Sequence, residues 1–331
     1  MSFFRFRSSC HMGVKFAMVS PALRPSWRTM KTLLATLLAA LIPMSVMAAD
    51  KQSPQARAIK AKNTAKIETA NGAEPALASS AALVIDANTG QTLYAKNAEL
   101  AVPIASITKV MTAMVVLDAK LPLDEAVQLA NEDIDTIKNS KSRLPIGTHF
   151  RRDDLIRLAL MASDNRAALA LGRSYPGGTT AFVEAMNAKA KVLGLNHTHF
   201  TDAAGLAPSN VASPADLGKL VAAASTYDLI REYSTTPSAD VTLPNTGRKV
   251  GFVNTNVLVR SSDWNIGLSK TGYISEAGKC LVMMARIANQ PVVIVLMDSW
   301  GRLTRIGDAN RIRKWLEKNP PKVAVTPQRS G

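Results

Sequence analysis

The sequence predicts an α+β fold, a layered domain whose antiparallel sheet combines strands from both ends of the chain. Three observations predict it. Short strand-like runs occur near residues 83–95 and again after residue 240, and the block between about 103 and 230 is mostly helical in its periodicity. Short turns join the late strands, which makes them antiparallel. Chain-end strands that meet in one sheet, with helices on both faces, form such a layered domain.

The first segment, residues 1–49, is typical of a leader followed by a secretory signal peptide. From Met30 the sequence has Lys31, an apolar run over 33–41, Pro43 and a small-residue site at 46–48. That run is too short for a spanning helix, which needs about 20 apolar residues, so we expect no stable membrane anchor. We therefore predict export to the periplasm, with Met30 as a hypothetical true start of translation.

Residues 50–78 are rich in Ala, Lys and Gln with little hydrophobic periodicity, which predicts a flexible linker. The ordered domain is expected over 79–318. Its first strands are predicted at 83–86 and 92–95, joined by a turn at Asn88-Thr89-Gly90. Helices are expected at 105–118, 152–163, 165–174, 179–194 and 213–225, with Asp153, Thr179 and Ser213 as caps.

The period changes after residue 240. Residues 240–256 are expected to form a hairpin, and 265–273, 277–287 and 291–299 are expected to be strands. An amphipathic helix over 302–318 ends the domain, and 319–331 is a Pro-rich tail. The residues after the 265–273 strand are filled by two strands and this helix, so we expect no second domain.

Composition narrows the function classes. The 331 residues carry a formal charge of +15, and residues 1–48 hold six basic residues and no acid, so the remainder is still basic. This favours an anionic setting such as a cell-wall polymer. No basic run is interleaved with aromatics, which argues against nucleic acid. The cysteines are Cys10 and Cys280, so loss of the leader leaves no internal disulfide, and Cys280 is expected in the core.

The stretch "PIASITKVMTAMVVLDA" over 103–119 places Lys109 three residues after Ser106 on an otherwise apolar helix. Residues three apart share a helix face, so the hydroxyl and the amine can meet. Burial disfavours a charged amine, and a neutral lysine can take the proton of a serine that attacks a carbonyl. The alternative is a capping serine beside a lysine that reaches solvent.

Two further motifs join this pair. Ser163-Asp164-Asn165 interrupts two apolar helical runs, where Ser163 could relay a proton and Asn165 could hold a substrate carbonyl; the alternative is a helix break capped by Ser163. Lys270-Thr271-Gly272 lies in a strand pattern, where Gly272 indicates close approach by another backbone and the lysine suits a carboxylate. The alternative there is a strand end with a solvated lysine.

Together, in the order Ser-x-x-Lys, Ser-Asp-Asn, Lys-Thr-Gly, the three motifs resemble those of penicillin-binding proteins and class A β-lactamases. The chain is similar to the low-molecular-mass penicillin-binding proteins, the serine DD-peptidases, from about residue 81 to 317, including "HTHFTDAAGLAPSNVASPADLGKL". The resemblance implies the serine β-lactamase and DD-peptidase fold and no metal or organic cofactor. It implies peptidoglycan stem peptides as substrate and β-lactams as covalent inhibitors.

The resemblance also assigns roles. Ser106 would be the acylated nucleophile and Lys109 its general base, while Ser163 and Asn165 would move protons and position substrate. Lys270 and Thr271 would bind substrate beside Gly272. The backbone N–H groups of Ser106 and Tyr273 would form the oxyanion hole.

Four interpretations within this superfamily remain open: a β-lactamase, a DD-carboxypeptidase, a DD-endopeptidase and an inactive scaffold. A β-lactamase needs a deacylating glutamate, and the nearest candidate, Glu184, lies in a plain amphipathic helix pattern. A DD-carboxypeptidase usually has a second β-rich domain. "SSDWNIGLSKTGYISEAGKCLVM" is similar to the D-alanyl-D-alanine endopeptidase branch, which we favour. An inactive wall-binding scaffold should have lost a motif residue, and none is missing.

Other polar residues have structural interpretations. His197 and His199 alternate without a third ligand, so no metal site is expected, and His149 is expected at the surface. Trp264 could line the cleft or pack in the core. Residues 152–154 are expected to be a solvated helix start.

Overall fold

The computed structural model describes residues 74–320. The chain divides into two units, Met1–Ala58 and Ile59–Gly331, and everything described here belongs to the second. The predicted leader, with Met30 and Cys10, lies outside the described residues, as do most of the linker and of the tail. Within 74–320, no helix combines the length and the apolar character that crossing a membrane requires.

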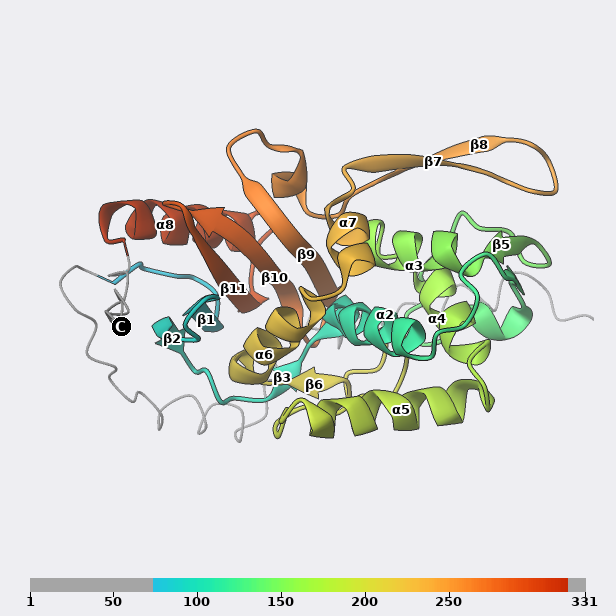
Figure 1. Cartoon of the computed structure of the whole chain (residues 1–331), viewed down its shortest axis with the longest axis horizontal. Helices are drawn as coiled ribbons and strands as arrows, with labels where there is room; N and C mark the ends of the chain where they lie inside the picture. Colours follow the sequence, from blue (N-terminus) through green and yellow to red (C-terminus); the bar gives the residue numbers. More distant parts are fainter. Residues whose placement is uncertain (1–73, 321–331) are drawn as a thin grey trace, which may run out of the picture. The chain divides into compact units, whose positions relative to one another are not determined.

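The two ends of the domain meet in one five-stranded sheet with strand order β2-β1-β11-β10-β9. β1 (Ala81–Asp86) pairs with β2 (Thr92–Lys96) on one side and with β11 (Gln290–Ser299) on the other. β10 (Gly278–Ile287) follows, and β9 (Asn265–Ile274) is the edge strand. All neighbours are antiparallel, so the predicted chain-end sheet is confirmed (Figure 1).

Both faces of this sheet are covered, which explains why its central strands are almost continuously apolar. In β11, Val293 and Val295 belong to one core with α6 (Pro214–Ala224). Ile294 and Leu296 face a second core with α8 (Thr304–Lys318). The two helices lie on opposite sides of the sheet (Figure 1). Cys280, fully buried, belongs to the first core as predicted, and burial raises the pKa of its thiol to about 11.

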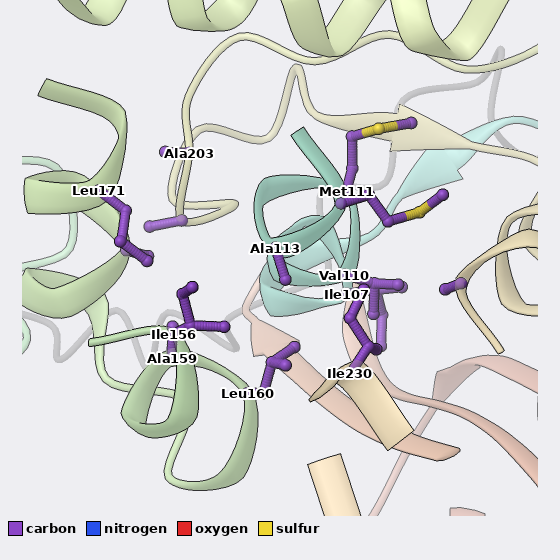
Figure 2. Close-up of a cluster of buried hydrophobic side chains, with 14 of the residues drawn as sticks. Ile107, Val110, Met111, Ala113, Ile156, Ala159, Leu160, Leu171, Ala203 and Ile230 are labelled. Carbon is purple, nitrogen blue, oxygen red and sulfur yellow. The ribbon is translucent and has the colours of Figure 1, made fainter. Parts of the chain in front are cut away.

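The helical middle of the chain packs around α2 (Thr108–Asp118), which follows a short 3₁₀ turn, η1 (Ala105–Ile107). Every residue of α2 from Thr108 to Val116 is buried. Its apolar side chains meet those of α3 (Arg152–Met161), α4 (Asn165–Arg173) and α7 (Asp228–Thr235), as Figure 2 shows for Val110, Leu160 and Ile230. The remaining helix of this region is α5 (Gly178–Val192), on which Glu184 is exposed.

Three small sheets complete the described fold. β3 (Val102–Pro103) pairs with β6 (Val211–Ala212), and β4 (Ala126–Gln128) pairs with β5 (His149–Arg151). β7 (Ser238–Thr242) and β8 (Lys249–Val253) form the predicted hairpin. The sequence did not predict α7, the first four of these strands, or the 3₁₀ turns η2 (Asn131–Asp133) and η3 (Val257–Arg260), because elements this short carry little periodicity.

Of the three predicted helix caps, only Ser213 is confirmed: its Oγ accepts from the backbone N–H of Asp216 at 3.2 Å. The prediction for Asp153 is wrong, because α3 begins after Arg151 and the Asp153 carboxylate instead accepts from the Tyr233 hydroxyl. The prediction for Thr179 is also wrong. α5 begins after Gly177, whose φ of 86° lies in the left-handed region that favours glycine.

The solvated helix start expected at 152–154 is wrong for Arg152, which is only 1% exposed. Its guanidinium donates to Glu125 Oε2 at 2.6 Å, Ser174 Oγ at 3.0 Å and the Pro122 carbonyl at 3.3 Å. Because a buried charge needs such partners, the burial depends on segments distant in the sequence.

Trp264 and the histidines lie in surroundings that give them structural roles. Trp264 packs on the α8 side of the sheet and donates to Asn310 Oδ1 at 3.3 Å, so it is a packing residue. His149 is exposed, as predicted. His197 Nδ1 lies 3.3 Å from Glu99 Oε2. Among residues 74–320, no three His, Cys, Asp or Glu side chains gather as a metal site would require.

Candidate active site

Ser106 and Lys109 lie where the edge strand β9 meets the start of α2. Ser106 is in η1, and Lys109 is one turn further on, with no exposed surface. Lys109 Nζ is 2.8 Å from Ser106 Oγ. The predicted pairing of a desolvated amine with one hydroxyl is therefore present, and the alternative of a solvent-reaching lysine is wrong.

The partners of Lys109 accommodate its neutral form. Nζ donates to Asn165 Oδ1 and to the Ala204 carbonyl, both at 2.6 Å, and its third neighbour is the Ser106 hydroxyl. Two hydrogens suffice for the two carbonyl oxygens, which leaves a neutral amine's lone pair directed at the only neighbour that can donate. Burial lowers the pKa of Lys109 from 10.5 to about 7, against the opposing charge of Asp202.

The carbonyl of Ala204 is positioned by a loop that sequence reasoning did not single out as functional. The carboxylate of Asp202 accepts from the backbone N–H groups of Ala204, Gly205, Leu206 and Ala207, at 2.6 to 3.1 Å. A Cβ on Gly205, whose φ is 76°, would lie 1.9 Å from the carbonyl oxygen of Ala105, in the turn that carries Ser106. The only sequence signal was the quoted segment that contains "TDAAGL".

The second motif is a sharp turn between α3 and α4. Ser163 has a φ of 58°, and Asp164 is the N-cap of α4, accepting from the Ala167 N–H at 3.0 Å, so the alternative of Ser163 as the cap is wrong. Asn165 contacts Lys109 through Oδ1 and donates from Nδ2 to Ser140 Oγ at 2.7 Å. The hydroxyl of Ser163 contacts Lys270.

Lys270 reaches across the site from β9. It is 1% exposed, and Nζ donates to Ser163 Oγ and to the Thr271 carbonyl, both at 2.8 Å. The alternative of a solvated strand-end lysine is therefore wrong. Burial, together with the nearby charges of Lys109 and Arg305, holds the pKa of Lys270 well below its usual range. The hydroxyl of Thr271 bonds to Thr255 Oγ1 at 2.7 Å.

Gly272 shows the close approach that the sequence predicted. A Cβ there would lie 2.7 Å from the Ile104 carbonyl oxygen and 3.2 Å from the backbone nitrogen of Ser106. Only glycine lets β9 lie against the turn that carries Ser106. The next residue, Tyr273, is 60% exposed, and Lys279 Nζ lies 4.0 Å from its ring centroid.

Arg305, in the first turn of α8, is a cation that lowers the pKa of Lys270 and that the sequence did not single out. Within residues 74–320, its Nε and Nη1 atoms are buried without a hydrogen-bond partner. Its charge lowers the pKa of Lys270, which places the two cations near each other. Nothing in the pattern of 302–318 distinguished Arg305 from the other basic residues of an amphipathic helix.

Comparison with known proteins now identifies the family. The family model for serine peptidases described as D-alanyl-D-alanine carboxypeptidase matches residues 67–301. The chain belongs to this family. It is accordingly a serine peptidase of the DD-peptidase class, and the resemblance drawn from the three motifs is confirmed.

Individual relatives refine the comparison. The chain is 48% identical over 241 residues to a D-alanyl-D-alanine endopeptidase of Pseudomonas aeruginosa, covering 73% of this chain and 78% of that protein. It is 45% identical over 277 residues to one of Escherichia coli, covering 84% and 87%. The crystal structure of the Streptomyces K15 DD-transpeptidase superposes with a TM-score of 0.69 at 29% identity, covering 74% of this chain and 98% of that one. The fold of this DD-peptidase domain is thus the predicted one.

Proposed function

We propose that the protein is a D-alanyl-D-alanine endopeptidase that hydrolyses cross-links between peptidoglycan stem peptides. One observation carries the chemistry: the amine of Lys109, without exposed surface, 2.8 Å from the hydroxyl of Ser106. The substrate preference is supported by the 48% and 45% identical relatives named endopeptidases.

Acylation follows from that geometry. Lys109 Nζ takes the proton of Ser106 Oγ, which forms a bond to the D-alanyl carbonyl carbon and gives a tetrahedral intermediate. The carbonyl oxygen, now negative, accepts hydrogen bonds from the backbone N–H groups of Ser106 and Tyr273. The close contact at Gly272 supports this role, because it brings the two peptide units to one point. Each such donor typically contributes about 2.7–4 kcal/mol of transition-state stabilisation.

Collapse of the intermediate breaks the C–N bond, and the departing nitrogen needs a proton. The hydroxyl of Ser163 supplies it and is reprotonated through the lysines, a role supported by the 2.8 Å contact of Ser163 with Lys270. Asn165 holds Lys109 in place and positions the substrate. Lys270, Thr271 and Arg305 attract the carboxylate beside the scissile bond, because two unpartnered guanidinium nitrogens favour an anionic guest.

Deacylation uses the same groups in reverse. A water molecule gives its proton to Lys109 Nζ and forms a bond to the ester carbon. The C–Oγ bond then breaks, and the proton returns to Ser106 Oγ. The acid is released and the free serine is restored. A β-lactam would acylate Ser106 by the same first step, which makes such antibiotics covalent inhibitors.

Periplasmic activity on the cell wall is part of the proposal. It rests on the signal-like sequence from Met30 and on the basic charge of the chain, which suits an anionic polymer. Carboxypeptidase activity, the release of terminal D-Ala, is the second candidate, because the matching family carries that description.

The test is digestion of purified sacculi with separation of the products. Loss of cross-linked dimers is expected, whereas release of free D-Ala alone would replace the endopeptidase with the carboxypeptidase. In parallel, Ser106→Ala should abolish covalent labelling by a fluorescent penicillin and shift the melting temperature by only about a few degrees, since one partly buried hydroxyl contributes little to stability. Labelling of the folded variant would show that another group is acylated.

A further inference from the structure

A cavity of about 370 Å³ opens beside the Ser163 side of the site. Its walls come from three segments: the turn between α3 and α4, the loop before β5, and the end of β8. They are Ser140, Lys141, Arg143, Ala162, Ser163, Asp164, Asn165, Phe252 and Val253. We call it the hairpin pocket, since Phe252 and Val253 of the β7–β8 hairpin line it; Figure 1 shows where this hairpin lies in the fold.

The walls of the hairpin pocket are held by specific contacts. Arg143 Nη1 donates to the Gly251 carbonyl at 2.6 Å, and its guanidinium lies 4.0 Å from the ring centroid of Phe252. The N–H of Thr255 donates to the Met161 carbonyl at 3.1 Å, which fixes the end of the hairpin to the end of α3. The pocket is therefore built by the fold and does not depend on one mobile side chain.

The chemistry of the lining suits a peptide that carries carboxylate groups. Val253 is 59% exposed and offers an apolar wall. Lys141 is exposed, and within 74–320 it forms no ion pair. The acid of the pocket, Asp164, already accepts from the Ala167 N–H and from Ser142 Oγ. The charge of Lys141 is therefore available to an anionic guest in the pocket.

The position of the pocket beside Ser163 indicates which part of the substrate it binds. In the proposed mechanism the departing nitrogen receives its proton from Ser163, and Ser163 lines the pocket. Whatever extends beyond that nitrogen therefore lies toward the hairpin. A carboxypeptidase releases a single D-Ala there, which does not need a further 370 Å³. An endopeptidase releases a whole second peptide with its own free carboxylate.

We infer that the hairpin pocket binds the departing stem peptide of the cross-link. Lys141 attracts a carboxylate of that peptide other than the one beside the scissile bond, and Val253 contacts its apolar part. This inference rests on the proposed endopeptidase activity and adds the subsite that selects a cross-link over a terminal D-Ala.

The experiment compares two substrates on three proteins. The substrates are a purified cross-linked muropeptide dimer and a monomeric pentapeptide that releases D-Ala. The proteins are the wild type, Lys141→Glu and the matched control Lys249→Glu, which makes the same charge change at an exposed position of β8 outside the pocket. Lys141→Ala serves as a milder second variant should the reversal disturb its loop.

For Lys141→Glu, kcat/KM on the dimer should fall about fivefold to tenfold more than kcat/KM on the pentapeptide, because an anionic guest is repelled. For Lys249→Glu the ratio of the two should equal that of the wild type. If both Lys141 variants keep the wild-type ratio of kcat/KM on the dimer to kcat/KM on the pentapeptide, the inferred role of the pocket is wrong. The proposed endopeptidase activity would be unaffected by that result. A wild type that releases D-Ala but leaves the dimer uncut would instead overturn the proposed function.

Discussion

Two lysines sit almost without exposed surface within one site, and each has a serine hydroxyl as a neighbour. Lys109 contacts Ser106, and Lys270 contacts Ser163, each at 2.8 Å. Burial disfavours the charge on both, and the charge of Lys109 further lowers the pKa of Lys270. The amine of Lys109, with a pKa of about 7, is thus close to giving up a proton at neutral pH, which an exposed lysine is not. Perturbed groups of this kind gather where proton transfer is needed.

The pKa of Lys109 predicts a pH dependence of acylation. A base must be unprotonated to act, so the acylation rate should rise with pH through about 7 and level off above it. Stopped-flow measurement of fluorescent-penicillin labelling across this range checks the prediction. A rate that is flat, or that falls as the pH rises through 7, would contradict the role of Lys109 as the base.

The loop after α5 shows how one element controls another. The carboxylate of Asp202 accepts hydrogen bonds from four backbone N–H groups. It also accepts one from the side-chain amide of Asn210, at 2.6 Å. The loop therefore presents the Ala204 carbonyl to Lys109 at a fixed distance. The Asp202 charge also raises the pKa of Lys109, opposing burial. A turn that looks like a connection thus sets both the place and the basicity of the amine.

Asp202→Asn should change acylation in two ways. Loss of the negative charge lowers the pKa of Lys109 further, so the midpoint of the pH profile should move below that of the wild type. Loosening of the loop should lower the plateau rate roughly tenfold, since misplacing a catalytic group by a fraction of an ångström is costly. The control is Asp263→Asn, the same change at an exposed position, which should keep the wild-type profile. An unshifted midpoint in Asp202→Asn would refute the coupling.

At the scale of the molecule, the sheet unites the two ends of the ordered domain. β1 lies between β2 and β11, and the residues just before β1 are bound to α8. Asp308 of α8 accepts from the backbone N–H groups of Ala78 and Ser79, at 3.1 and 2.7 Å, and from Ser79 Oγ at 2.6 Å. Contacts so distant in sequence require the whole domain to fold together.

Asp308→Asn should lower the free energy of unfolding by about 1–3 kcal/mol, since buried donors lose a charged acceptor. Burial opposes ionisation of Asp308, but bonds from Ser79, Ala78 and Arg311 hold its pKa below its usual range. Its stabilisation is therefore full above the unfolded pKa of about 4 and is lost as the pH falls through the folded value. Urea unfolding at neutral and acid pH should show the difference between wild type and variant shrinking in acid. An equal difference at both pH values would exclude the ionised carboxylate as its source.

The sequence by itself determined the classes of element, the chain-end sheet and the three motifs of the site. Period-two and helical patterns are local, and a lysine three residues from a serine shares its helix face, so the elements and this pairing could be predicted without a distant partner. The role of Gly272 could be predicted for the same reason, because a glycine inside a strand already indicates close approach by another backbone.

Only the tertiary structure decided which polar side chains lost their water and which met across the site. Arg152 was expected in solvent and is buried, and Arg305 and Asp202 were not distinguished from ordinary surface charges. Burial and partnership of a charge depend on segments that come together only in the fold, such as Glu125 for Arg152 or β9 for Ser163. The hairpin pocket likewise has walls from three separate parts of the chain, and no local pattern records a space enclosed between them.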